Sequence, residues 1–176
     1  MLRLPRDRNT GYVTPRPAIC ETVHVRVSAK SDYALRALVE IAIRDAGSPV
    51  SAEALGKAQD IPHGFLQAIL ADLRKADIVV SQRGQSGGWR FAREPSTVSV
   101  ADVIRAVDGP LVSVYGLRPE AVDYGEATQV LQHVWIAARR ALREVFEQVT
   151  IQQLADGELP SSVSELTADE DSWQPH

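Results

Sequence analysis

The run of residues 51–75 constrains the fold most, because it holds two short helical patterns that only three residues separate. Ser51 is a typical N-cap for a helix over the residues AEALGKAQ. Asp60-Ile61-Pro62 interrupts that pattern, and Pro62 suits the first positions of the next helix. The apolar stripe of that helix consists of Phe65, Leu66, Ile69, Leu70 and Leu73. Two short helices joined by a tight turn predict a helix-turn-helix.

Helical and strand patterns flank this unit. Apolar residues recur at helical spacing from Ser28, and Gly47-Ser48-Pro49 ends that first helix. After the helix-turn-helix, DIVVSQ is apolar and β-branched, a glycine-rich stretch comes next, and WRFA alternates in polarity. This order predicts a strand, a loop and a strand, which together form a hairpin. The expected fold class is mainly α with a small β-hairpin wing.

The C-terminal half contains a capped helix, a connection and a long helical pattern. Ser99 caps VADVIRAVD, which Gly109-Pro110 ends, and residues 110–125 form an irregular connection. The apolar stripe over residues 126–149 predicts a helix of roughly 36 Å, longer than a small core covers, so a partner helix is implied. The residues we expect at that dimer interface are Leu131, Val134, Trp135, Ala138, Leu142, Val145 and Phe146.

Charge is distributed unevenly, although the net charge is only −4. Residues 1–24 carry 4 basic and 2 acidic residues, residues 25–95 carry 10 and 8, and residues 96–176 carry 5 and 13. A small basic surplus therefore lies around the hairpin, beside a strongly acidic segment. This asymmetry is compatible with a nucleic-acid-binding face, and two solvated surfaces are the alternative.

The sequence also predicts the compartment. No window approaches the roughly 18 consecutive apolar residues that a membrane span requires. Residues 1–17 lack the apolar stretch of a secretory signal, and the single cysteine, Cys20, excludes an intramolecular disulfide. We therefore expect a cytoplasmic protein that has no membrane partner.

The stretch GQSGG matches Gly-x-Ser-x-Gly, the nucleophile elbow of serine hydrolases. An elbow requires a helix immediately after its serine, whereas Ser86 precedes WRFA, which predicts a strand. We therefore interpret the match as accidental and expect no enzyme. The glycines are expected to supply the positive φ angles that a hairpin loop needs.

The order of these elements resembles the Rrf2 family of bacterial transcriptional regulators. The resemblance is carried by VSAKSDYALRALVEIA, by FLQAILADLRKADIVVSQRGQSGGWRFA and by VSVADVIRAVDGPL, and it runs from about Val25 to Gly157. It implies a dimeric winged helix-turn-helix protein that binds DNA, pairs through the long helix and controls transcription. Our leading hypothesis is a homodimer that represses transcription at a palindromic operator in double-stranded DNA.

Composition and the resemblance together divide the chain into segments. Residues 1–24 are expected to be a disordered extension, and residues 25–109 to form the winged helix-turn-helix DNA-binding domain. Residues 110–125 form a linker and effector segment, and residues 126–157 the dimerisation region. Residues 158–176 form an acidic flexible tail.

Candidate DNA-binding residues follow from how such a domain docks. A helix in the major groove reaches base edges near its N-terminus, here with His63, Gly64 and Gln67, and Gln67 suits adenine. The wing would bring its residues close to the DNA backbone or the minor groove. The wing residues are Arg83, Gly84, Ser86, Gly87 and Arg90, and the candidate phosphate contacts are Lys30, Arg36, Arg74 and Lys75. The alternatives are an ion pair of Arg36 with Glu40, and solvated charges at Arg74 and Lys75.

The sequence departs from the family at its sensor. Many members carry three cysteines after the DGPL run that bind an iron–sulfur cluster, whereas residues 110–125 contain none. The four histidines lack metal-ligand spacing, so we expect no metal and no cofactor. A small-molecule or protein effector is the remaining option, around Tyr115, Tyr124 and Trp135, unless these residues only pack the dimer. The alternative function is a protein-interaction module on a winged-helix scaffold, which the acidic C-terminal half favours.

Overall fold

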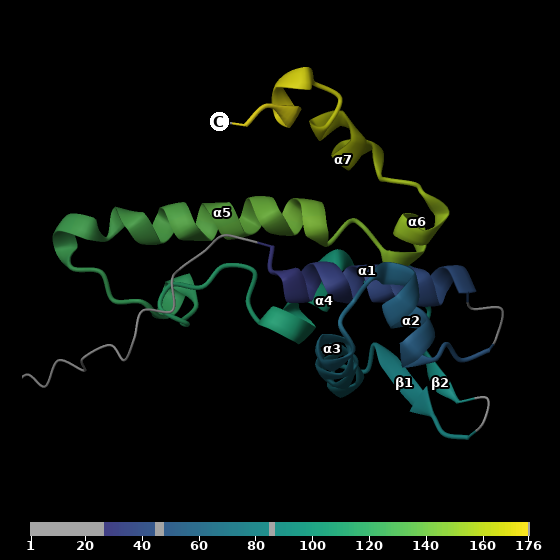
Figure 1. The fold of residues 1–176 in the computed structure, drawn as a ribbon. Coiled ribbons are helices and arrows are strands. Elements are labelled where there is room, and N and C mark those ends of the chain that lie inside the picture. The colour runs from purple at the N-terminus through teal and green to yellow at the C-terminus, as the bar shows by residue number, and fades with distance from the viewer. Residues whose placement is uncertain (1–26, 45–47, 85–86, 176) are drawn as a thin grey trace, which may run out of the picture.

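The computed structural model describes residues 27–44, 48–84 and 87–175 of the chain (Figure 1). Its helices are α1 (Ala29–Arg44), α2 (Ala52–Gln59), α3 (His63–Lys75), α4 (Val100–Asp108), α5 (Val130–Phe146), α6 (Ile151–Asp156) and α7 (Ser161–Leu166). Its strands are β1 (Val79–Gln82) and β2 (Gly88–Phe91). Short 3-10 turns cover Pro95–Thr97, Pro119–Ala121, Glu126–Thr128 and Glu170–Trp173. The predicted fold class, mainly α with a β-hairpin wing, is confirmed.

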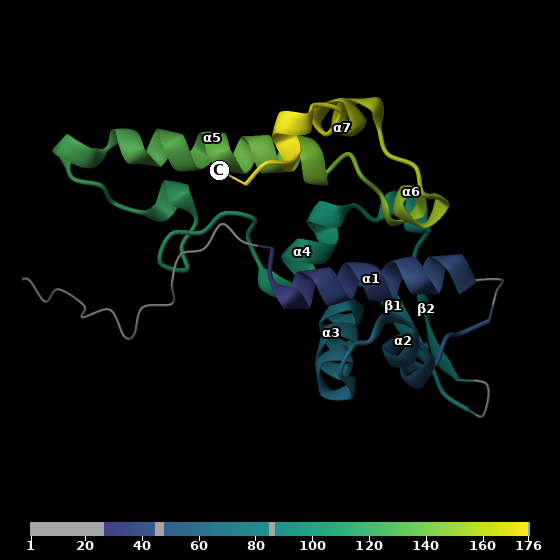
Figure 2. The same ribbon diagram turned by 45° about the horizontal axis from the view of Figure 1, so that its top comes forward.

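Helix α1 separates two layers of the molecule. On one side of α1 lie α2, α3 and the β1–β2 hairpin, and on the other side lie α5, α6 and α7 (Figures 1 and 2). The two strands pair antiparallel, with Val79 opposite Phe91 and Gln82 opposite Gly88. The helix-turn-helix and the wing therefore share one side of the molecule, away from α5.

The predicted N-caps Ser51 and Ser99 are confirmed by their hydrogen bonds. The Ser51 side chain accepts a hydrogen bond from the backbone N–H of Ala54 at the start of α2. Ser99 and Asp102 form a reciprocal capping box at the start of α4. Pro62 occupies the N-cap position of α3, so that helix begins one residue later, at His63.

The main core lies where α1, α2, α3 and the hairpin meet, and it includes a segment from far along the chain. Ile151 of α6 is fully buried in the same cluster as Leu38 and Leu66. The Ile151 N–H donates to the Val98 carbonyl at 2.9 Å, and the Val100 N–H donates to the Val149 carbonyl at 2.9 Å. Part of the segment 126–157, which the sequence assigned to dimerisation, thus belongs to the core of the winged domain.

A third segment extends the hairpin, because Val50 pairs with Trp89 through backbone hydrogen bonds of 2.9 and 2.8 Å. A Cβ at Gly88 would lie 2.5 Å from the Val50 carbonyl oxygen, so only glycine fits there without a backbone shift. Among the described wing glycines, only Gly84 has a positive φ, of 117°. The predicted reason for the glycines is therefore correct for Gly84, whereas Gly88 serves the close approach of two backbones.

The long helix is shorter than predicted. The pattern over residues 126–149 contains a 3-10 turn, then α5, and then the extended backbone that pairs with Val98 and Val100. The 17 residues of α5 span roughly 26 Å rather than 36 Å. Beyond α6, the predicted flexible tail contains α7 and a 3-10 turn whose Trp173 is exposed.

Within the described residues, the helices are all too short or too polar to cross a lipid bilayer.

Candidate nucleic-acid interface

Helix α3 presents a polar face to solvent at its N-terminal end. Its apolar residues Leu66, Ile69, Leu70 and Leu73 are fully buried in the core. His63, Gly64 and Gln67, which the sequence predicts as base-reading residues, are all exposed. The i, i+3, i+4 spacing of the buried residues fixes this rotation of the helix. The side chains that a major groove would meet are therefore free to reach it.

Phe65 is a functional candidate that sequence reasoning missed. The apolar stripe placed Phe65 in the core, but 56% of the residue is exposed, so that prediction is wrong. Its ring rests edge-on against Tyr33 of α1, with the ring centroids 6.3 Å apart. The buried stripe of α3 begins one residue later, at Leu66, and the position of Phe65 between His63 and Gln67 was the available signal. An exposed phenyl ring beside Gln67 suits an apolar contact with a thymine methyl group.

The wing carries two exposed arginines. Arg83 comes directly after β1 and Arg90 lies in β2, and neither forms an ion pair or side-chain hydrogen bond within the part of the chain that the structure describes. Gly84 and Gly87 are described on either side of Gln85 and Ser86, which lie outside the described residues. Gly87 is followed directly by the strand β2, where a nucleophile elbow would require a helix.

Lys30, a predicted phosphate contact, lies between three helices. Its ammonium donates to the Asp72 carboxylate of α3 at 2.8 Å and to the Val107 carbonyl of α4 at 2.6 Å. Asp72 also accepts from Lys75 at 2.8 Å. Hydrogen bonds from Lys30 and Lys75 lower the pKa of the Asp72 carboxyl from 3.8 to about 2. Lys30 thus stabilises the junction of α1, α3 and α4.

Arg36, another predicted phosphate contact, binds the end of α2. Its guanidinium donates to the Gln59 carbonyl and to the Gln59 side chain, and it stacks 5.6 Å from the centroid of the Tyr33 ring. The alternative pairing with Glu40 is wrong, because Arg36 pairs with Asp32 at 3.5 Å and Glu40 pairs with Arg44. Among the predicted phosphate contacts, Arg74 is exposed at the end of α3, and the described residues offer it no ion pair.

Among the described residues, those that cover helix α5 lie along one side of it. Its Gln132 donates to the carbonyl of Pro119 at 3.2 Å, and its Arg139 pairs with Glu120 at 2.7 Å, so the 110–125 connection lies along one face. The opposite stripe is apolar and open, with 72% of Val130 and 51% of Val134 exposed. The remaining predicted interface residues are Leu131, which is exposed, and Trp135, Ala138, Leu142, Val145 and Phe146, which are half-buried.

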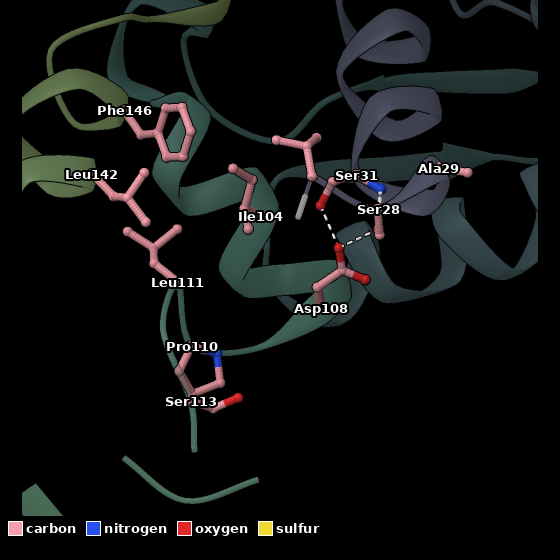
Figure 3. A pocket seen from close by; sticks show the side chains of 11 residues that line it. Ser28, Ala29, Ser31, Ile104, Asp108, Pro110, Leu111, Ser113, Leu142 and Phe146 are labelled. Carbon is pink, nitrogen blue, oxygen red and sulfur yellow. Dashed lines mark hydrogen bonds between the residues drawn. The ribbon is translucent and has the colours of Figure 1, made fainter. Parts of the chain in front are cut away.

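Leu142 and Phe146 line a cavity of about 620 Å³ between α5, α4 and the start of α1 (Figure 3). Asp108 lies at its polar end, where it accepts hydrogen bonds from Ser28 and from the buried Ser31, the latter at 2.6 Å. Apolar side chains form the other end. Two of the predicted dimer residues therefore face their own chain.

The predicted effector residues are not gathered at a described cavity. Tyr115 is exposed at a positive φ of 53°, and the Tyr124 hydroxyl is buried without a hydrogen-bond partner among the described residues. Neither of these residues nor Trp135 lines the cavity in Figure 3 or a second cavity on the other side of the 110–125 connection.

An iron–sulfur cluster does not fit the residues present. The connection supplies no thiolate, and of its two carboxylates, Glu120 and Asp123, Glu120 is engaged by Arg139. In the described ranges, no three side chains of the His, Cys, Asp and Glu types gather as a metal would require.

Comparisons with known proteins agree with this architecture. The sequence model of the Rrf2 family, described as an iron-dependent transcriptional regulator, matches residues 27–157. The chain is 41% identical over 145 residues to a Mycobacterium tuberculosis protein that bears the name HTH-type transcriptional regulator Rv1287, covering 82% of this chain and 90% of that one. It is 30% identical over 137 residues to the HTH-type transcriptional regulator CymR of Bacillus subtilis, covering 76% and 94%.

Two solved structures are similar over most of their length. CymR, the global cysteine regulator of B. subtilis, superposes with a TM-score of 0.63 at 28% identity, covering 76% of this chain and 98% of that one. IscR of T. potens superposes with a TM-score of 0.60 at 29% identity, covering 85% and 96%.

Proposed function

Because the chain belongs to the Rrf2 family of DNA-binding transcriptional regulators, we propose that it binds a palindromic operator as a homodimer and represses transcription there. The observation that carries this proposal is the face of α3. His63, Gly64, Phe65 and Gln67 are exposed together beside a fully buried stripe, on the same side of α1 as the wing. A helix presented in this way fits the major groove of B-form DNA.

Each exposed group has a chemical role in this proposal. The amide of Gln67 pairs with the N6 and N7 atoms of adenine, and Phe65 packs against a thymine methyl group. The guanidiniums of Arg83 and Arg90 contact phosphates or the minor groove on either side of a turn that Gly84 and Gly87 keep free of bulk. Ser86 belongs to the same proposed wing contact.

The phosphate contacts differ in how free their charges are. Arg74 has no ion pair among the described residues, and Lys75 is three-quarters exposed, so both can reach a phosphate. Lys30 and Arg36 are held by Asp72 and Gln59, and their main role is to position α3 and α2. We propose that they contribute to affinity through that positioning.

The homodimer is supported by the apolar stripe of α5, which is most exposed at Val130 and Val134. Val130, Val134, Ala138 and Val145 recur at the spacing of one helix face, and the 110–125 connection contacts a different face through Gln132 and Arg139. A large exposed apolar stripe marks an interaction surface, and the symmetric partner is a second α5.

Operator selection tests the function. Genomic fragments bound by the purified chain are selected and footprinted, and binding is repeated over a salt series. We expect a palindromic site whose affinity falls steeply with salt, with half-sites roughly 34 Å apart. Absence of an enriched site, together with binding of a protein partner, would favour the interaction module.

Two variants then separate the reading helix from the wing. Gln67→Ala should cost about 1–3 kcal/mol at one adenine position and relax the base preference there. Arg83→Ala should weaken all sequences alike and lower the salt slope by about one. Arg140→Ala, on α5, is the matched control and should bind as the parent does. If Gln67→Ala and Arg83→Ala lower the affinity equally for every DNA sequence, the assignment of Gln67 as a base-reading residue is refuted.

The dimer has its own test, in sedimentation equilibrium without DNA. Val134→Asp places a charge in the apolar stripe and should yield monomers, because an unpaired charge is costly to bury. His133→Asp, at the adjacent exposed position outside the stripe, should remain a dimer. A monomeric parent chain, or a dimeric Val134→Asp, contradicts the proposed interface.

A further inference from the structure

The basic residues of the acidic half converge on one cavity. Residues 96–176 carry 13 acidic and only 5 basic residues, and all five are arginines. Four of them, Arg105, Arg118, Arg139 and Arg143, line a cavity of about 490 Å³ between the end of α4, the 110–125 connection and α5. In a segment of net charge −8, randomly distributed surface charges would not be expected to bring four guanidiniums together in one place.

The carboxylates at this cavity do not balance the arginines. Glu147 accepts from both Arg105 and Arg143, the latter at 2.9 Å, so a single carboxylate serves two guanidiniums. Glu120 accepts from Arg139 at 2.7 Å. Arg118 has no ion pair or side-chain hydrogen bond among the described residues.

A further carboxylate contributes little. Asp102 lies 3.7 Å from Arg105 and equally far from Arg93, which is outside the cavity. Guanidinium groups therefore remain in excess at the cavity, and the four together offer more N–H donors than these carboxylates can accept.

The titration of the carboxylates agrees with a positive potential. Hydrogen bonds from Arg143 and Arg105 lower the pKa of Glu147 from 4.5 to about 2. The pKa of Glu120 is lowered by a hydrogen bond from its own backbone N–H, then by Arg139, and by the charge of Arg118. Both carboxylates thus lie in a field that favours negative charge.

We propose that this cavity binds a small-molecule anion that carries a phosphate or two carboxylates. Arginine presents a planar fork that binds phosphate and carboxylate oxygens in pairs, and this segment uses arginine alone, without lysine. The volume lies in the range of small-molecule pockets. The cavity joins three parts of the chain, since Arg105 belongs to α4, Arg118 to the connection, and Arg139 and Arg143 to α5. That such a ligand is the effector of DNA binding rests on the proposed function, whereas the site itself does not.

Calorimetry on the full chain without DNA tests the site. Pyrophosphate and citrate serve as separate probes at constant ionic strength, so that phosphate and carboxylate ligands are distinguished. We expect saturable binding of at least one probe with one site per chain. Arg118→Gln should weaken that binding about tenfold, because it removes a charge-assisted donor without breaking an ion pair.

Two further variants locate the bound probe. Arg140→Gln lies next to Arg139 on α5 but pairs with Glu144 outside the cavity, so it should bind as the parent does. The double variant Arg83→Gln with Arg90→Gln should also bind normally, because its changes lie on the proposed DNA face. Should Arg118→Gln fail to fold, Arg143→Lys, which keeps the charge and removes the fork, replaces it and should weaken binding likewise.

The proposal is overturned by three results. These are the absence of saturable binding of either probe, equal affinities for Arg118→Gln and Arg140→Gln, and a loss of binding only in the wing variant. The last result would assign the probe to the DNA face. Because no DNA is present, a failed operator search leaves the outcome of this experiment unchanged.

Discussion

Replacing Lys30 by methionine distinguishes a residue that stabilises the fold from one that contacts DNA. The ammonium of Lys30 donates to Asp72 at 2.8 Å and to the Val107 carbonyl at 2.6 Å, which joins α1 to α3 and α4. Methionine keeps the unbranched apolar part of the side chain, lacks the terminal ammonium, and so removes both hydrogen bonds. The free energy of unfolding should therefore fall, while the apolar part of the side chain still packs.

The size of this loss in unfolding free energy can be worked out from the pKa of the Asp72 carboxyl. A pKa lowered from 3.8 to about 2 corresponds to roughly 2 kcal/mol if all of it contributed to stability. Lys75 supplies part of this effect, and the side chains of Lys30 and Asp72 are 32% and 26% exposed, so solvent weakens the pair. We assign about 1 kcal/mol to the Lys30–Asp72 pair and about 1 kcal/mol to the bond with Val107. Lys30→Met should thus cost about 2 kcal/mol.

Urea denaturation at neutral pH measures this cost, and a double-mutant cycle with Asp72→Asn isolates the pair at about 1 kcal/mol. Lys57→Met is the control, because Lys57 is exposed on α2, and its free energy of unfolding should change by less than about 0.5 kcal/mol. The stabilising role of Lys30 is refuted if Lys30→Met leaves the urea midpoint unchanged but weakens DNA binding and reduces the dependence of that binding on salt. Lys30 would then be a phosphate contact.

Three further predictions concern stability. Gly88→Ala should destabilise the protein by about 1–3 kcal/mol in thermal unfolding, since the new Cβ would lie 2.5 Å from the Val50 carbonyl oxygen. Gly64→Ala, whose Cβ would meet open space, should not destabilise it, and equal losses in the two variants would contradict the close approach at Gly88. Ser99→Ala removes the N-cap of α4 and should lower the free energy of unfolding in urea by about 1 kcal/mol. Ser96→Ala, at an exposed position three residues earlier, should change it little, and equal values for the two variants would count against the capping box. The Asp72 carboxyl has a lower pKa in the folded chain than its ordinary 3.8, so its contribution to the free energy of unfolding is complete above about pH 4 and is lost as the pH falls toward about 2. Asp72→Asn should therefore flatten the dependence of stability on pH in this range, and an unaltered dependence would refute the pairing with Lys30 and Lys75.

Local signals in the sequence predicted most of the fold. The helix ends at Ser51 and Ser99 follow from side chains that bind backbone groups a few residues away. The hairpin follows from β-branched and aromatic runs around glycines. The exposed position of Gln67 follows from the helical spacing of its buried neighbours. Each of these features is determined within a dozen residues.

Long-range contacts account for the features that sequence reasoning missed. The helical pattern of the long helix continues to Val149, yet that backbone is extended because it pairs with Val98 and Val100, about fifty residues earlier. The apolar stripe of α3 does not reveal that the core ends at Leu66 and leaves Phe65 outside. Likewise, neither the partner of Lys30 nor the convergence of the arginines follows from spacing, because both depend on how separate helices meet.

The junction after α5 connects the two proposed sites. The segment directly after α5 is held to the winged domain by two backbone hydrogen bonds, and Arg105 of α4 pairs with Glu147 at the end of α5. On its other side, α4 is joined through Val107 to Lys30, and Lys30 binds Asp72 of α3, the proposed recognition helix. The end of α5 is therefore anchored to the body that carries α3, while its open stripe is free to pair. In a homodimer paired through α5, the angle of α5 against α4 determines the distance between the two recognition helices. An anion bound by Arg105, Arg139 and Arg143 contacts both α4 and α5 and would therefore change that angle. A small change in this angle would alter the distance between the two recognition helices, and with it the half-site spacing that the dimer fits.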